Sequence, residues 1–245
     1  MKKIRWLAWF AFLLPLFANT QEVQITPVIL PNDLITGIVG IAQDNHGYIW
    51  MVDNNNNGLL KYDGINIEAF KPDANKQNSL GALRLECLFA DSKGNIWIGT
   101  FQNGLDRYEP ELDRFKHYQH KKDDSNSIRS NLIRVITEDE EGNIWIGTGE
   151  GLDMLDTKTG RFHHFTSNEK DASDLGSLVD NRVRVIFEDS RGVLWVGTVG
   201  DGLHILDRKT EIFQRCTYDP KNPEKLSRPP VKNLFGYSPD HITFI

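Results

Sequence analysis

Four tryptophans recur at nearly equal distances along the chain, and this recurrence limits the possible folds more than any other feature. They are Trp50, Trp97, Trp145 and Trp195, and successive ones stand 47, 48 and 50 residues apart. Each ends an Asp-x-x-Gly-x-x-Trp segment, which begins at Asp44, Asp91, Asp139 or Asp189. A period of this length, made of short apolar runs and glycine turns, predicts one compact β unit per repeat.

Each repeat holds four apolar runs that are too short for ordinary helices. In the third repeat they cover residues 132–138, 143–148, 151–155 and 161–165. The first run alternates as a strand does, which places Ile133 and Val135 on one face and Ile136 on the other. The segment from Asp139 to Gly142 predicts a tight hairpin, because Asp can accept hydrogen bonds from the turn amides and Gly can adopt a positive φ.

The repeats therefore predict an all-β fold, a β-propeller with four four-stranded antiparallel blades. The four repeats cover about residues 31–77, 78–125, 126–175 and 176–223, and a degenerate start of a fifth covers 224–245. We expect the four tryptophans to be buried, because periodic aromatic residues fill the space between units of a repeat array. Cys87 and Cys216 fall on strands two blades apart, so we expect them to be buried and free.

The segments 91–100 and 139–148, each followed by Gly-Leu, resemble the repeat of the two-component regulator propeller family. Residues 189–198 keep the frame with conservative changes, whereas residues 50–53 read Trp-Met-Val-Asp where the family has Trp-Ile-Gly-Thr. The resemblance covers about residues 31–217. It implies the periplasmic sensor region of a hybrid sensor histidine kinase, here as an N-terminal fragment with an incomplete seven-bladed propeller. Members of the family commonly sense oligosaccharides.

The start of the chain has the pattern of an export signal. Lys2, Lys3 and Arg5 precede an apolar segment at residues 6–18, which is too short for an ordinary membrane span. We therefore expect residues 1–20 to be a signal peptide, residues 21–245 to be a partial propeller, and the protein to be periplasmic.

The charge of the chain argues against nucleic acid as a partner. The formal net charge is −6, with 39% hydrophobic and 25% charged residues, which is typical of a globular protein without affinity for phosphate backbones. No spacing of cysteine or histidine indicates a metal site, and we expect no cofactor. Association with a second copy through open blade edges is expected, and contact with a membrane only through a segment downstream of this chain.

A ligand is expected where the long connections between blades meet the loops that follow each Gly-Thr. Long polar loops on a rigid scaffold are common recognition sites. The candidate residues are amides, carboxylates and guanidiniums, which suit an oligosaccharide or another small hydroxyl-rich ligand. They are Glu86, Gln102, Asn103, Asn131, Arg134, Glu150, Asn181, Arg184 and Asp201.

The predicted function is an extracytoplasmic sensor without catalytic activity and without its own kinase domain. The alternatives are a propeller lyase or glycan-active enzyme, and a scaffold for protein partners. Lyase chemistry on a related repeat needs a histidine near the central channel. His117, His163 and His164 fall on fourth, outermost strands, His204 falls on a third strand, and His46 lies in a turn. This placement predicts that no histidine serves such chemistry, and no catalytic residue is assigned.

Overall fold

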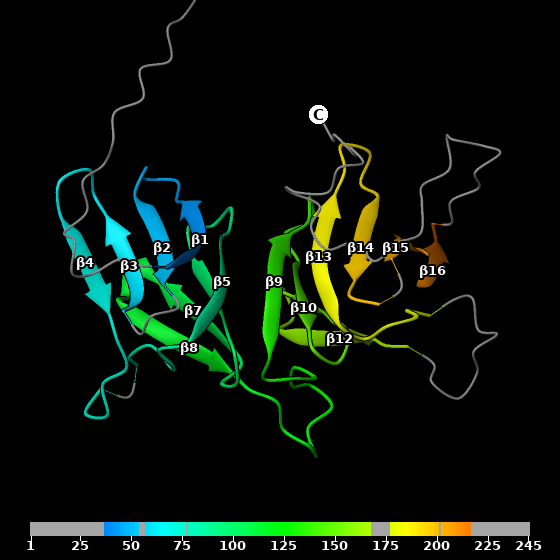
Figure 1. The fold of residues 1–245 in the computed structure, drawn as a ribbon, viewed down its shortest axis with the longest axis horizontal. Coiled ribbons are helices and arrows are strands. Elements are labelled where there is room, and N and C mark those ends of the chain that lie inside the picture. Colours follow the sequence, from blue (N-terminus) through cyan, green and yellow to red (C-terminus); the bar gives the residue numbers. More distant parts are fainter. Residues whose placement is uncertain (1–36, 54–56, 77, 168–176, 201, 217–245) are drawn as a thin grey trace, which may run out of the picture. The chain divides into compact units, whose positions relative to one another are not determined.

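The described residues of the chain form strands that assemble into four sheets (Figure 1). The computed structural model describes residues 37–53, 57–76, 78–167, 177–200 and 202–216. The predicted signal peptide (1–20) and the degenerate fifth repeat (224–245) lie outside the described residues.

Each sheet contains four antiparallel strands in chain order. Blade 1 comprises β1 (Ile38–Gln43), β2 (Ile49–Asp53), β3 (Gly58–Tyr62) and β4 (Ile67–Phe70). Blade 2 comprises β5 (Leu85–Ala90), β6 (Ile96–Thr100), β7 (Leu105–Glu109) and β8 (Arg114–Tyr118), with a 3-10 helix at Pro110–Leu112. Blade 3 comprises β9 (Ile133–Glu138), β10 (Ile144–Thr148), β11 (Leu152–Asp156) and β12 (Arg161–Phe165). Blade 4 comprises β13 (Val183–Glu188), β14 (Leu194–Thr198), β15 (Gly202–Asp207) and β16 (Ile212–Arg215). The predicted all-β fold with four four-stranded blades is confirmed.

The hydrophobic core lies between successive blades. The first strand β5 contacts both β1 and β9, and β13 contacts β9, so neighbouring blades pack in chain order. Trp50, Trp97 and Trp145 each belong to the cluster between their own blade and the next, and they are 0%, 0% and 2% exposed. Trp195 is half-buried. The tryptophans therefore join blades together, as a repeat array requires.

The glycine that follows the tryptophan allows the blades to approach closely. A Cβ atom placed on Gly99 would lie 2.5 Å from Cys87 Sγ and 2.7 Å from Ile133 Cγ2 on the next blade. Any larger side chain would therefore push blades 2 and 3 apart. Cys87 and Cys216 are free, as expected. Both side chains are half-buried, whereas full burial was expected.

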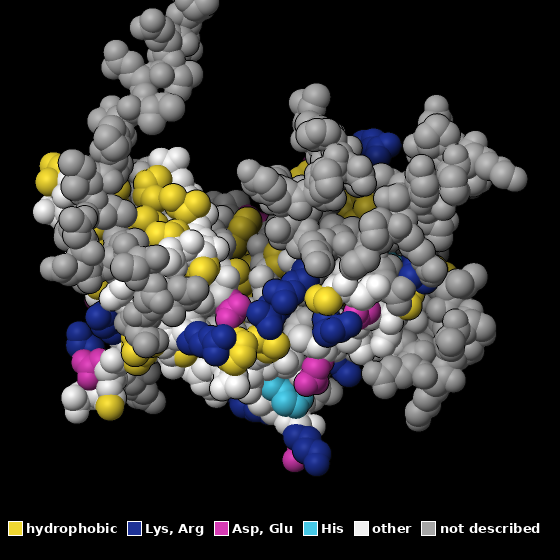
Figure 2. Space-filling view, viewed as in Figure 1, with side chains coloured by type: hydrophobic (Ala, Val, Ile, Leu, Met, Phe, Trp, Pro, Cys, Tyr) yellow, Lys and Arg dark blue, Asp and Glu magenta, His cyan; other side chains and the backbone are white. Residues whose placement is uncertain are grey.

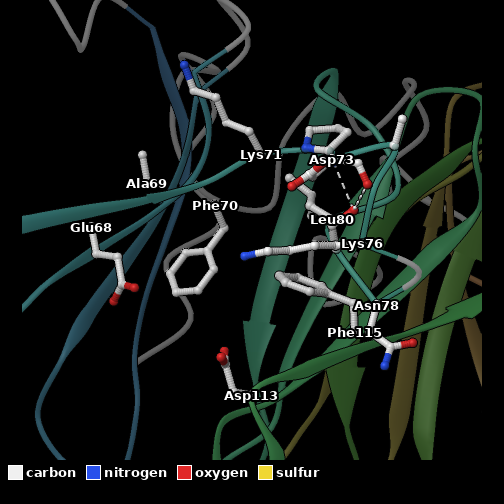
Figure 3. Close-up of a pocket in the computed structure, with 13 residues that line it drawn as sticks. Glu68, Ala69, Phe70, Lys71, Asp73, Lys76, Asn78, Leu80, Asp113 and Phe115 are labelled. Carbon is white, nitrogen blue, oxygen red and sulfur yellow. Dashed lines mark hydrogen bonds between the residues drawn. The ribbon is translucent and has the colours of Figure 1, made fainter.

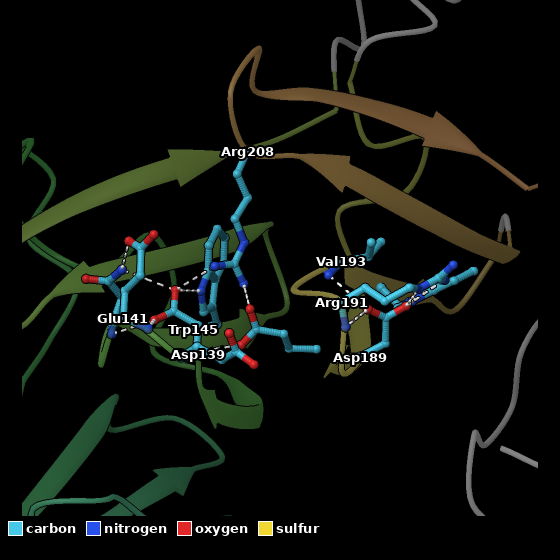
Figure 4. Close-up of polar contacts among 11 residues, drawn as sticks. Asp139, Glu141, Trp145, Asp189, Arg191, Val193 and Arg208 are labelled. Atoms are coloured by element: carbon cyan, nitrogen blue, oxygen red, sulfur yellow. Dashed lines mark hydrogen bonds and ion pairs between the residues drawn. The ribbon is translucent and has the colours of Figure 1, made fainter. Parts of the chain in front are cut away.

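The Asp-x-x-Gly turn forms the same hydrogen bonds in all four blades. In blade 3, Asp139 Oδ1 accepts from the backbone amides of Glu141 and Asn143 at 3.0 and 2.8 Å. Its Oδ2 accepts from the indole Nε1 of Trp145 at 2.8 Å (Figure 4). Gly142 adopts a φ of 81°, as the hairpin requires. The aspartate thus fixes the turn and satisfies a buried indole at the same time.

The first strand of each blade contains a β-bulge that the alternating pattern does not reveal. In blade 3, Ile133 pairs with Thr148 and Val135 with Gly147, so Arg134 is the extra residue. Ile133 and Ile136 therefore share the core between blades 2 and 3, whereas Val135 packs in the core between blades 3 and 4. The prediction that Ile133 and Val135 share a face is wrong, because the bulge shifts the alternation by one residue.

Candidate functional site

The strand bulges bring charged residues from three blades to one region, which we call the loop end. It comprises the bulge residues, together with the described parts of the loops after the second strands and of the long connections between blades. The bulge residue is Glu86 in blade 2, Arg134 in blade 3 and Arg184 in blade 4. All three are predicted ligand-binding residues, and they occupy equivalent positions on neighbouring first strands. Bulges commonly re-aim side chains beside functional sites.

An ion pair connects blades 2 and 3 at the loop end. Arg134 Nη1 donates to Glu86 Oε2 at 2.9 Å, and each side chain is 21% exposed. Arg84 Nε lies 3.7 Å from Glu86 Oε1, so one carboxylate faces two guanidiniums. Partial burial lowers the pKa of Arg184, and the nearby positive charge of Arg134 lowers this pKa further. The cluster therefore holds more positive charge than Glu86 balances.

Phe101 is a loop-end residue that the sequence analysis did not single out. It follows the last residue of β6, and its ring is half-buried. The guanidinium carbon of Arg84 lies 3.5 Å from the ring centroid, and that of Arg134 lies 5.8 Å from it. Gly149 and Val199 stand at the equivalent positions in blades 3 and 4. An aromatic residue in only one repeat, directly after the Gly-Thr, was the signal that could have identified it.

A groove of about 440 Å³ extends from Phe101 between blades 2 and 3. It brings together three of the predicted ligand-binding residues, Gln102, Asn131 and Glu150. The side chains of Gln102 and Glu150 are exposed. The other lining residues include Arg129 and His120, together with Ser130, Leu132 and Gly149. Because Phe101 also contacts Arg134, the groove and the charged cluster form one continuous candidate site.

Several predicted amide residues instead support the loops. Asn103 Nδ2 donates to the Gly81 carbonyl at 2.7 Å, and its Oδ1 accepts from Gln119 Nε2 at 3.0 Å. Asn131 Oδ1 accepts from the His120 amide at 2.8 Å, and Asn181 Oδ1 accepts from the Ser167 amide at 2.6 Å. These amide oxygens hold the long connections in place. The last predicted residue, Asp201, lies outside the described residues.

His120 lines the groove, although the prediction that no histidine serves lyase chemistry did not consider it. That prediction considered histidines on strands and turns, and His120 lies in the connection after β8. Its Nδ1 lies 2.8 Å from the Ile128 carbonyl oxygen, which can only accept a hydrogen bond. Nδ1 therefore carries the proton, and in the neutral ring Nε2 has a free lone pair.

Two other histidines lie on outermost strands as predicted, and each pairs with an aspartate of the third strand, a contact that was not predicted. His117 Nδ1 lies 2.6 Å from Asp106 Oδ1, and His164 Nδ1 lies 2.8 Å from Asp153 Oδ1. In each pair the hydrogen bond to the carboxylate raises the histidine pKa. The second oxygen of Asp106 accepts from the Gly81 amide at 2.7 Å. The pairs therefore fasten the connections between blades.

A larger cavity of about 880 Å³ lies between the outer strands of blades 1 and 2 (Figure 3). Phe70 and Phe115 line it, with the charged side chains of Glu68, Lys76 and Asp113 around them. None of the predicted ligand-binding residues lines this cavity. Its charges are of both signs, and it lacks the cross-blade cluster of the loop end.

The surface view agrees with a charged cluster. Figure 2 shows Lys and Arg side chains gathered near the middle of the face in view, with Asp and Glu side chains beside them.

A further finding concerns the membrane: none of the helices within the described ranges is long and apolar enough to span one.

The family model for the two-component regulator propeller matches residues 79–102, 127–150 and 177–200. Each match contains the end of the connection before a blade and the whole of its first two strands, in blades 2, 3 and 4. A search of curated proteins gave no match.

Solved structures share the fold at low sequence identity. One is the extracellular domain of BT3049 from B. thetaiotaomicron, a protein assigned as a hybrid two-component system, with 24% identity and a TM-score of 0.55. The similarity covers 76% of this chain and 31% of that domain. Another is a catalytically inactive virginiamycin B lyase from Staphylococcus aureus with quinupristin, with 17% identity and a TM-score of 0.58. Here 80% of this chain and 60% of the lyase are covered.

The chain thus spans less than two thirds of either protein, and at these identities the likeness concerns the fold alone. The repeats carry the closer relationship, because the matched segments coincide with the turns and strands that build three of the blades. The chain is a β-propeller protein, and its second, third and fourth blades each contain a segment that matches the two-component regulator propeller model.

Proposed function

We propose that this chain is an extracytoplasmic ligand-sensing propeller of a two-component system, and that it binds oligosaccharide at the loop end without catalysing a reaction. The observation that carries the proposal is the continuity of the groove with the ion-paired cluster through Phe101. In this proposal the bound state of the propeller is signalled to a histidine kinase.

The chemistry of the loop end suits a sugar. Phe101 offers an apolar ring surface to the C–H face of a pyranose, while Gln102 and Glu150 offer exposed polar groups beside it. Polar residues make up most of the groove lining, and Phe101 and Leu132 supply its larger apolar side chains. Arg134 adds a guanidinium whose direction is fixed by its ion pair with Glu86. The site therefore combines a stacking surface with oriented hydrogen-bonding groups.

The proposed location outside the cytoplasm rests on two supports. Residues 1–20 have the composition of a signal peptide, with three basic residues before a short apolar segment. The similar structure from B. thetaiotaomicron is an extracellular domain.

Calorimetry with a panel of neutral and charged oligosaccharides tests the proposal. At least one of them should bind, with no product detected by chromatography. Phe101→Ala should weaken this binding about tenfold, because the stacking surface is lost. Leu112→Ala is a matched control, since Leu112 is 59% exposed and lies away from the loop end. If no oligosaccharide binds the folded chain, the proposal is wrong.

A lyase is the second candidate function, and His120 is the observation that favours it. A neutral His120 has Nε2 available as a general base inside the groove. The lyase structure shows that the same fold can carry an enzyme. Consumption of a ligand by the chain, abolished by His120→Gln, would replace the sensor proposal with this one.

A further inference from the structure

The described charges in the cluster around the bulge residues do not balance. Two carboxylates belong to the cluster, Glu86 and Asp180. Four arginines surround them, at positions 84, 134, 182 and 184. The whole chain has a formal net charge of −6, so a local excess of arginines runs against its average composition. Such a local reversal of sign attracts ligands of the opposite charge.

Three of the four arginines already have carboxylate partners. Arg84 and Arg134 share Glu86, at 3.7 and 2.9 Å. Arg182 holds Asp180 with two hydrogen bonds, from Nε at 3.0 Å and from Nη2 at 2.7 Å. Among the described residues, neither carboxylate forms an ion pair with the remaining guanidinium, that of Arg184.

Arg184 is the exception within the part of the chain that the structure describes. No described residue forms an ion pair or a hydrogen bond with its side chain, which is exposed. Partial desolvation and the positive charges of Arg134 and Arg182 lower its pKa, while Glu86 acts in the opposite direction. An added negative charge beside this guanidinium would therefore be stabilised.

We propose that the loop-end site selects oligosaccharides that carry an oxyanion, either a carboxylate or a sulfate, and that Arg184 binds this oxyanion. The inference rests on the proposed function and specifies its ligand class. A guanidinium can donate two parallel hydrogen bonds to such a group, which an ammonium cannot do. Phe101 and Gln102 then bind the neutral part of the sugar chain from the adjacent groove.

Calorimetry on the full chain with three matched probes tests this inference. The probes are an oligogalacturonate, the same oligosaccharide with its carboxylates methyl-esterified, and a sulfated galactose oligosaccharide of equal length. A charged probe should bind about tenfold more tightly than the esterified one. The preference should shrink as salt rises from about 0.05 to about 0.5 M. Comparing the carboxylate and sulfate probes identifies which oxyanion the site prefers.

Variants assign the effect to Arg184. Arg184→Gln should remove the preference for the charged probe while leaving affinity for the esterified probe unchanged, and Arg184→Lys should restore it only in part. Arg161→Gln is the matched control, because Arg161 is an exposed arginine at the start of the outer strand β12. It should behave as the unmodified chain.

The outcomes separate the two claims. Equal binding of charged and esterified probes, unaffected by Arg184→Gln, would overturn the oxyanion inference and leave the sugar-sensing proposal standing. Absence of binding to all three probes, and to the wider neutral panel, would overturn the proposed function itself, and the oxyanion inference with it.

Discussion

The turn end and the loop end of the blades differ in how strictly they repeat. At the turn end, the hairpins at residues 44–48, 91–95, 139–143 and 189–193 make the same aspartate–amide and aspartate–indole hydrogen bonds. At the loop end, the bulge residue changes from Val39 to Glu86, Arg134 and Arg184. Identical bonds in every blade indicate a scaffold, whereas varied chemistry at equivalent positions indicates recognition.

Removing a turn-end aspartate should have the largest effect on stability. In Asp91→Ala, the amides of Lys93 and Asn95 and the buried indole of Trp97 all lose their acceptor. We expect the free energy of unfolding in urea to fall by about 3 kcal/mol. Asp123→Ala, in an exposed connection, should change it by less than about 0.5 kcal/mol. Similar losses in both variants would contradict the role assigned to the turn end.

The contact between turns of neighbouring blades should contribute less. Glu138 accepts from the Ser92 amide at 2.7 Å and from the Ser92 hydroxyl at 2.8 Å, which joins blades 2 and 3. Glu138→Ala should lower the free energy of unfolding by about 1 kcal/mol, and Glu138→Gln by less, because the amide oxygen still accepts. Ala90 occupies the equivalent position in blade 2 and offers no such acceptor. If Glu138→Ala matches Asp91→Ala, the ranking of these contacts is wrong.

The histidine pairs predict a smaller, pH-dependent effect. Both ring nitrogens of His164 face acceptors, Asp153 Oδ1 at 2.8 Å and the Ser125 carbonyl at 2.9 Å, so the protonated ring is favoured and its pKa is raised. A raised folded-state pKa contributes stability that is complete below about pH 6.5 and is lost as pH rises through the raised value.

His164→Gln should therefore flatten the fall in thermal midpoint between about pH 5.5 and about pH 8. The difference should correspond to less than about 1 kcal/mol, because part of the side chain is exposed to solvent. His163→Gln is the control, since His163 is exposed and its side chain forms no hydrogen bond with a described residue. If the thermal midpoint of His164→Gln depends on pH as that of the unmodified chain does, protonation of His164 does not contribute to the pH dependence of stability.

The smallest effect on stability is expected at the loop end. Arg184→Gln should change the free energy of unfolding by less than about 0.5 kcal/mol, because no described residue pairs with this side chain. The same urea titrations measure it. A loss as large as that of Asp91→Ala would mean that Arg184 is structural and that the two ends do not differ in kind.

The sequence predicted the repeated features well because each rests on a local physical rule. The Asp-x-x-Gly hairpins and the buried tryptophans Trp50, Trp97 and Trp145 were recognisable from spacing alone. The hydrogen bond from each indole to its aspartate was not predicted, although the two residues stand six positions apart in every repeat.

The loop end was harder to predict because its geometry depends on pairing between strands and between connections. An alternating pattern cannot reveal the bulge that aims Arg134 at Glu86. Asn131 and Asn181 are ideal sugar-binding residues by composition, yet their amide oxygens accept from backbone amides 11 and 14 residues away. His120 and Phe101 lie in non-repeating positions, which a repeat alignment does not compare.

Hydrogen exchange of the chain, with and without a bound oligosaccharide, tests the division between the two ends most directly. The account predicts added protection at the loop end, in residues 101–103 and 119–131, and unchanged exchange in the turn-end hairpins at 139–143 and 189–193. Protection confined to the turn-end hairpins, with none at the loop end, would contradict it.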